Sequence, residues 1–107
     1  MRIGDSTHLL VLQCSDRGLP EPTLEHRFCE RRWRFDLAFV KQMLAVEIEG
    51  GSWVGGRHIS GVGFQNDIMK YNAATILGWS LLRFTPAMVQ SGIAIAHIER
   101  ALSHEEG

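Results

Sequence analysis

The sequence contains few cysteines, and the two that it has are far apart. Cys14 and Cys29 form no Cys-x-x-Cys pair, so the sequence provides neither a disulfide framework nor the four close ligands of a structural zinc site. We therefore expect free thiols in a reducing compartment, and a cytoplasmic location.

Long apolar runs are also missing. No segment reaches the roughly 18 residues needed to span a bilayer. The first residues include the early acid Asp5, where a secretion signal requires a long apolar stretch. No association with a membrane is expected.

The chain has no excess of charge of one sign. Eleven lysines and arginines stand against 12 aspartates and glutamates, for a formal net charge of -1. Strong attraction of the whole molecule to phosphate is not expected from this balance. Neither a Gly-x-Ser-x-Gly nor a Gly-Lys-(Ser/Thr) motif occurs, which argues against a serine hydrolase and a P-loop nucleotide-binding protein.

What is present predicts a single domain over residues 1–107. Apolar residues alternate with others over residues 33–40 and 44–49, a period of two that predicts a hairpin turning near Lys41. Helical spacing over residues 65–77 predicts a helix with Ile68, Tyr71, Thr75 and Ile76 on one side. A first helix is expected to about residue 17, ending at Gly18, and a last helix from Thr85-Pro86 to about 102. Further strands are expected over 23–28 and 79–84. A mobile glycine-rich loop over 50–63 and a frayed tail over 103–107 complete the chain. Together they predict an α/β fold, with a four-stranded mixed sheet flanked by helices in the order helix, strand, strand, strand, helix, strand, helix.

Three acids are expected on one face of this sheet. Strand alternation puts Asp36 opposite Phe35 and Leu37, and puts Glu47 and Glu49 together on one face. Paired strands with aligned apolar faces would gather these carboxylates, and a divalent cation would relieve their repulsion. Oxygen ligands favour Mg²⁺ or Mn²⁺. The alternative is a solvated strand face with no metal.

Five segments in this order carry a resemblance. They are Arg34-Phe35-Asp36, residues 44–51 (LAVEIEGG), Arg57-His58, Asp67-x-x-Lys70-Tyr71-Asn72, and residues 78–84 (GWSLLRF). The set is similar to the PD-(D/E)XK nuclease superfamily, in particular to small bacterial or phage endonuclease domains close to the very-short-patch-repair endonucleases. The resemblance implies a restriction-endonuclease-like core and a divalent-metal-dependent endonuclease that hydrolyses phosphodiester bonds in DNA.

The resemblance also implies roles for individual residues. Asp36 and Glu47 match the metal ligands, the main-chain carbonyl of Ile48 is a third, and Glu25 stands near the place of an upstream acid. Glu49 departs from the pattern because a lysine is usual there. It would then bind a second metal or hold the attacking water. Lys70 or His58 would supply the missing function, and an ordinary surface lysine paired with Asp67 is the alternative for Lys70.

Arginines near the expected site are candidates for contacts with phosphate, because a guanidinium group bridges two phosphate oxygens. They are Arg27, Arg31, Arg32, Arg34 and Arg57. Trp53 in the glycine-rich loop could stack against a base or pack in the core, whereas Trp33 and Trp79 are expected in the core.

Three other interpretations stay open. The first keeps the fold and loses the activity, giving a nucleic-acid-binding or partner-binding protein. The second is an RNase H-like nuclease, in which a distant acid such as Asp5 or Asp67 is a ligand. The third is a structural module without metal affinity. RNA is left open as a substrate, and a homodimer is one way for so small a domain to cut both strands.

Overall fold

Four strands form one mixed sheet between helices. The computed structural model describes residues 3–50 and 61–106. Its elements, in chain order, are α1 (Ile3–Asp16), β1 (Thr23–Arg27), β2 (Arg34–Phe39), β3 (Leu44–Ile48), α2 (Gly61–Ile76), β4 (Ser80–Phe84), α3 (Pro86–Ser91) and α4 (Ile93–Glu106). The α/β class and the four-stranded mixed sheet predicted from the sequence are confirmed.

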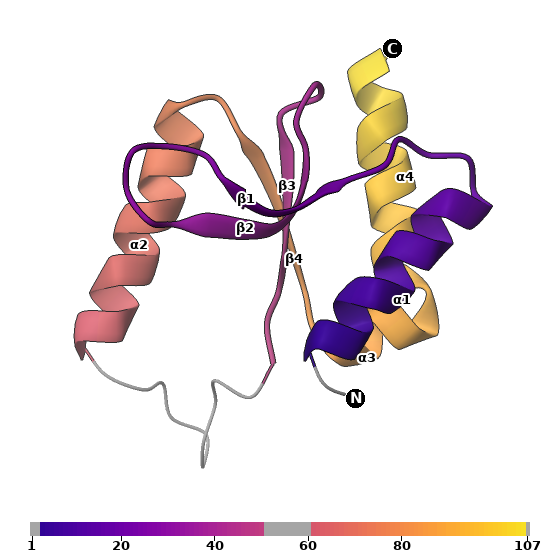
Figure 1. Cartoon of the computed structure of the whole chain (residues 1–107), viewed down its shortest axis with the longest axis horizontal. Helices are drawn as coiled ribbons and strands as arrows, with labels where there is room; N and C mark the ends of the chain where they lie inside the picture. The colour runs from indigo at the N-terminus through magenta and orange to yellow at the C-terminus, as the bar shows by residue number, and fades with distance from the viewer. Residues whose placement is uncertain (1–2, 51–60, 107) are drawn as a thin grey trace.

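The strands lie in the sheet in the same order as in the chain. β1, β2 and β3 pair antiparallel, and β3 and β4 pair parallel, joined by a crossover through α2. Figure 1 shows α2 alone on one side of the sheet and α1, α3 and α4 on the other. Within the described residues, no helix has both the length and the apolar character needed to cross a membrane.

The end of the first helix is as predicted. Gly18 has a φ of 66°, in the left-handed region that glycine adopts without strain. The N–H of Leu19 donates to the carbonyl of Cys14 at 3.0 Å, and the N–H of Gly18 donates to the carbonyl of Ser15 at 3.0 Å. These bonds satisfy carbonyls of the last helical turn and direct the chain toward β1.

The last predicted helix is in fact two helices. Thr85 caps α3, accepting a hydrogen bond from the N–H of Met88 on its side chain, and Pro86 follows as predicted. Gly92 then takes a φ of 89°, which ends α3 after six residues. Periodicity alone does not reveal such a break, because an isolated glycine is tolerated within a helix. The predicted frayed tail is also wrong over most of its length, since α4 continues to Glu106.

The larger core fills the space between the sheet and the helices α1, α3 and α4. It contains the side chains of β3 that point away from the carboxylates, namely Leu44, Val46 and Ile48, as the alternation predicted. Residues from all three helices complete it, among them Leu10, Val89, Ile95 and Ile98. Each fully buried aliphatic side chain contributes about 1.5–3 kcal/mol through removal from water, so this face fixes the orientation of β3.

A smaller core lies between the sheet and α2. Its buried members are Phe35, Ala38, Ala45, Ala74 and Trp79. The expectation that Phe35 would share a face with Leu37 is therefore wrong, because Leu37 belongs to the larger core. Strict alternation fails at the start of β2, next to a departure from extended geometry in β1, where Glu25 has a φ of 50°.

The α2 helix is longer than expected. It begins at Gly61 rather than near residue 65. Two residues of its predicted apolar side are exposed, Ile68 at 43% and Ile76 at 83% of full exposure. Ala74 instead contacts the sheet, where Ala38 and Ala45 provide a shallow surface. Small side chains on both partners let the helix approach the sheet closely.

Candidate active site

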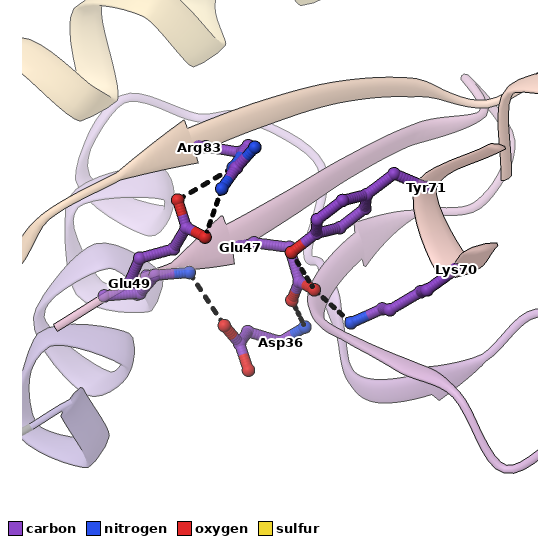
Figure 2. A network of polar contacts seen from close by, with 7 residues as sticks. Asp36, Glu47, Glu49, Lys70, Tyr71 and Arg83 are labelled. Atoms are coloured by element: carbon purple, nitrogen blue, oxygen red, sulfur yellow. Dashed lines mark hydrogen bonds and ion pairs between the residues drawn. The ribbon is translucent and has the colours of Figure 1, made fainter. Parts of the chain in front are cut away.

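Asp36 and Glu47 are linked across the ladder between β2 and β3. The pairing of Leu37 with Val46 continues to these two acids, which places them opposite one another. The N–H of Asp36 donates to Oε2 of Glu47 at 2.9 Å, and the N–H of Ile48 donates to Oδ2 of Asp36 at 2.7 Å. Each carboxylate is thus held by the main chain of the neighbouring strand, as Figure 2 shows.

Glu47 is a buried carboxylate with two side-chain partners from α2. Only 5% of the residue is exposed. Its Oε1 accepts a hydrogen bond from the ammonium of Lys70, and the hydroxyl of Tyr71 donates to the same oxygen at 3.4 Å. Burial raises the pKa of Glu47 above its ordinary value, and the hydrogen bond and charge of Lys70 oppose that rise.

Lys70 reaches the acids because of the close packing of α2. Ala74, one turn further along the helix, is buried against the sheet, and residues four apart lie on one side of a helix. The lysine side chain is only 14% exposed. The resemblance makes Lys70 one of two candidates for the function of the missing lysine, and the structure places its ammonium against Glu47. Its partner is Glu47, not Asp67.

Glu49 forms a separate ion pair with Arg83 of β4. The guanidinium donates from Nε to Oε2 at 2.7 Å and from Nη2 to Oε1 at 2.6 Å, a two-point contact that fixes both side chains. The guanidinium carbon also lies 4.9 Å from the centre of the Tyr71 ring. The hydrogen bond with Glu49 raises the pKa of Arg83. Burial, followed by the negative charges of Glu47 and Glu49, raises the pKa of Tyr71, so its hydroxyl keeps its proton at neutral pH.

The donor atoms match the preference of a hard divalent cation. Asp36 and Glu47 offer carboxylate oxygens, and strand geometry puts the carbonyl of Ile48 on the same side as its N–H, which points at Asp36. Oxygen donors of this kind suit Mg²⁺ or Mn²⁺, both of which keep several waters when bound. Within residues 3–50 and 61–106, no three side chains of His, Cys, Asp or Glu are grouped to hold a metal. A divalent cation at this site would therefore be held by two carboxylates and one main-chain carbonyl.

The other predicted site residues lie elsewhere. Two acids are exceptions: the register of β1 and β2 puts Glu25 opposite Asp36, with its side chain exposed, and Glu49 belongs to the network but is bound to Arg83. Arg27 donates from Nε to the carbonyl of Arg31 at 2.9 Å and from Nη2 to the carbonyl of Glu30, so it closes the loop between β1 and β2. Arg34 is exposed at the start of β2.

Three predicted residues, Trp53, Arg57 and His58, lie outside the described residues, as does most of the predicted glycine-rich loop. The two tryptophans expected in the core differ from each other. Trp79 is buried, whereas Trp33 is half-buried beside Phe28, with the guanidinium of Arg31 4.4 Å from its ring centre.

Two residues of this network were not singled out from the sequence. Arg83 was part of the segment that carries the resemblance, but no role followed from it. Pairing of β3 with β4 in parallel puts Arg83 beside Glu47, and the sequence does not reveal that register. Tyr71 was expected on the apolar side of α2. The only indication in the sequence that Tyr71 belongs to the site is its position directly after Lys70, within the segment that carries the resemblance.

Comparison with known proteins gives no match to a family model, a curated protein or a solved structure.

Proposed function

We propose that the protein is a divalent-metal-dependent endonuclease that hydrolyses phosphodiester bonds in DNA, with a restriction-endonuclease-like core of the PD-(D/E)XK kind. The observation that carries the proposal is the Asp36–Glu47 pair on neighbouring strands, with the ammonium of Lys70 bound to Glu47. Two carboxylates and one lysine at a sheet surface are the groups that this chemistry needs. The sequence resemblance assigns the same two acids to the metal.

Asp36 and Glu47 would hold Mg²⁺ or Mn²⁺, together with the carbonyl of Ile48. The chemistry that such an ion supplies when bound is neutralisation of phosphate charge and a lower pKa for the attacking water. The main-chain N–H groups of Asp36 and Ile48 orient the two carboxylates before any ligand arrives. This preorganisation limits the rearrangement needed at the moment of reaction.

Two cations border the acids. The ammonium of Lys70 lies against Glu47, and Glu49 holds the guanidinium of Arg83 on the neighbouring strand. A phosphodiester placed over Asp36 and Glu47 would meet positive charge from both α2 and β4. We assign Lys70 to the reacting phosphate and Arg83 to a flanking phosphate. Glu49 then serves to position Arg83.

Cleavage of plasmid DNA tests the proposal. Supercoiled plasmid is incubated with the protein in Mg²⁺ or Mn²⁺, with EDTA as the negative control and Asp36→Asn as the inactive variant. Conversion to nicked or linear DNA is expected only for the unaltered protein with metal. Intact plasmid in every reaction, together with intact single-stranded DNA, would count against a nuclease.

A second candidate function follows from the satisfied state of Glu47. Both of its oxygens accept hydrogen bonds from the protein itself, and Lys70 balances its charge. This arrangement also suits a nucleic-acid-binding or partner-binding protein that has the same fold and no activity. Binding of DNA with no dependence on metal, and without cleavage, would favour it.

A further inference from the structure

Lys70 occupies the oxygen atom that a metal ion would need. Oε1 of Glu47 accepts from Lys70 and Tyr71, while Oε2 accepts from the main chain of Asp36. The donor to Oε2 is a main-chain N–H of β2, directly after the last pair of the ladder between β2 and β3, so its position is set by the backbone. The contacts to Oε1 come from side chains of α2, so Oε1 is the atom that can exchange partners.

Exchange of the ammonium for a divalent ion at Oε1 would change the net charge of the site. Asp36 and Glu47 together carry two negative charges, and Lys70 returns one positive charge. Replacing the ammonium by a divalent ion at Oε1 brings two cations close together, at a cost that is high in a buried site. A bound phosphodiester, with one negative charge, would neutralise the excess.

The ammonium of Lys70 also lies close to two aromatic rings. Its Nζ is 5.4 Å from the ring centre of Tyr71 and 5.9 Å from that of Phe35 while it is bound to Glu47. Both distances fall within the range of a cation–π contact. These contacts do not depend on Oε1, so they can keep the ammonium beside the acids once Oε1 has another partner.

We propose that Lys70 is the resident counter-ion of the Asp36–Glu47 pair, that a divalent metal must displace it from Oε1 of Glu47, and that the displaced ammonium then favours the binding of a phosphodiester. This inference rests on the proposed function, because it describes how the same site is regulated. Lys70 lowers the affinity of the free protein for metal and couples metal binding to substrate binding. The coupling is reciprocal, since each ligand changes the affinity for the other by the same factor.

Calorimetric titration with Mn²⁺ tests the displacement. Lys70→Gln removes the charge and keeps an N–H donor for Oε1, so we expect it to bind Mn²⁺ about tenfold more tightly than the unaltered protein, a coupling of ordinary size. The matched control is Lys41→Gln, which removes the only other lysine of the chain, exposed in the turn between β2 and β3. This control should not alter the affinity by more than about twofold.

The unaltered protein offers an independent measurement. Protein labelled with ¹³C at the lysine Cε atoms has two lysine signals, which Lys41→Gln assigns. Addition of Mg²⁺ should move the Lys70 signal and leave the Lys41 signal in place. Circular dichroism of each variant tests whether the fold is kept, and the labelling measurement needs no variant at Lys70.

A slowly cleaved phosphorothioate DNA duplex tests the coupling to a phosphodiester. It should tighten Mn²⁺ binding to the unaltered protein by about tenfold and to Lys70→Gln by clearly less. A duplex with uncharged methylphosphonate linkages should have no such effect.

The outcomes separate this inference from the proposed function. Equal Mn²⁺ affinities for the unaltered protein and Lys70→Gln, or an unmoved Lys70 signal at saturating Mg²⁺, would overturn the inference about Lys70 and leave the nuclease proposal in place. Absence of any heat with Mn²⁺ in both proteins, in the presence and absence of DNA, would remove the metal site and both proposals with it.

Discussion

The carboxylate of Glu47 accepts a hydrogen bond from the main-chain N–H of Asp36 at 2.9 Å, across the ladder between β2 and β3. The position of this carboxylate is therefore set by the backbone of the neighbouring strand as well as by its own. An amide side chain at position 47 keeps an oxygen acceptor for this bond and loses the negative charge. Asp36→Asn likewise keeps an oxygen for the N–H of Ile48. Glu47→Gln loses one of two acceptors, because its amide nitrogen then faces the ammonium of Lys70 and the hydroxyl of Tyr71.

We expect Asp36→Asn and Glu47→Gln each to lower the rate of metal-dependent DNA cleavage by at least about a hundredfold. The reason is the loss of one of the two carboxylates available to the metal. The controls are Asp16→Asn, at an exposed acid, and Glu99→Gln, in the exposed ion pair with Arg17. Both should cleave normally. A fully active Asp36→Asn or Glu47→Gln protein would remove that acid from the proposed site.

The ion pairs at Glu47 and Glu99 should differ in their effect on stability. Lys70 and Glu47 have side chains exposed by 14% and 7%, and Arg17 and Glu99 by 43% each. Lys70→Met leaves a buried carboxylate without its counter-charge, so we expect a loss of about 3–5 kcal/mol in the free energy of unfolding. Arg17→Met should cost at most about 1 kcal/mol. Urea unfolding followed by circular dichroism measures both, and equal losses would show that the contact of Lys70 is as weak as a surface pair.

The pH dependence of stability should carry the signature of Glu47. Its pKa is raised in the folded protein by burial, so over the interval above the ordinary pKa of a glutamate the folded state binds more protons than the unfolded state. The free energy of unfolding then falls as the pH rises through that interval. Glu47→Gln cannot titrate at this position and should lack this fall. The difference between the two proteins, measured by urea unfolding from pH 4 upward, gives the contribution of this group, and parallel curves would contradict it.

The two thiols should differ in reactivity. Burial raises the pKa of Cys14 to about 11, whereas Cys29 is half-buried in the loop between β1 and β2. At pH 8 only about one in a thousand Cys14 side chains is a thiolate, and the thiolate is the reactive form. We expect a thiol reagent to modify one cysteine of the folded protein and both after unfolding. Cys29→Ser should leave the folded protein unreactive, and rapid modification of that variant would show that Cys14 is accessible.

Much of this site could be predicted from sequence, because strand alternation depends only on neighbouring residues. Alternation over residues 44–48 was enough to put Glu47 on the face opposite Val46 and Ile48. It failed at Phe35, where the irregular backbone at Glu25 of the paired strand is not visible in the sequence of β2 itself.

Contacts between distant segments were harder to predict. The partner of Glu49 depends on the register between β3 and β4, two strands separated by a helix and a long connection. The helical spacing of Lys70 and Ala74 allows both to face the sheet, but their partners there, Glu47 and the alanines of β2 and β3, lie on other segments. In both cases the deciding interaction involves a side chain far away in the sequence.

The pairing of Glu49 with Arg83 leads to the last prediction. We expect Glu49 to act by holding Arg83 near a phosphate. Glu49→Gln and Arg83→Gln should then slow cleavage by a similar factor, about tenfold. The double variant should be no slower than either single variant, because the two residues act as one unit. Mn²⁺ affinity should be unchanged in all three proteins. The exposed pair of Arg17 and Glu99 supplies the matched control, and its glutamine variants should cleave normally. Weaker Mn²⁺ binding in Glu49→Gln but not in Arg83→Gln would instead make Glu49 a metal ligand, as the sequence resemblance implied, and the contact with Arg83 would then be an arrangement of the metal-free protein.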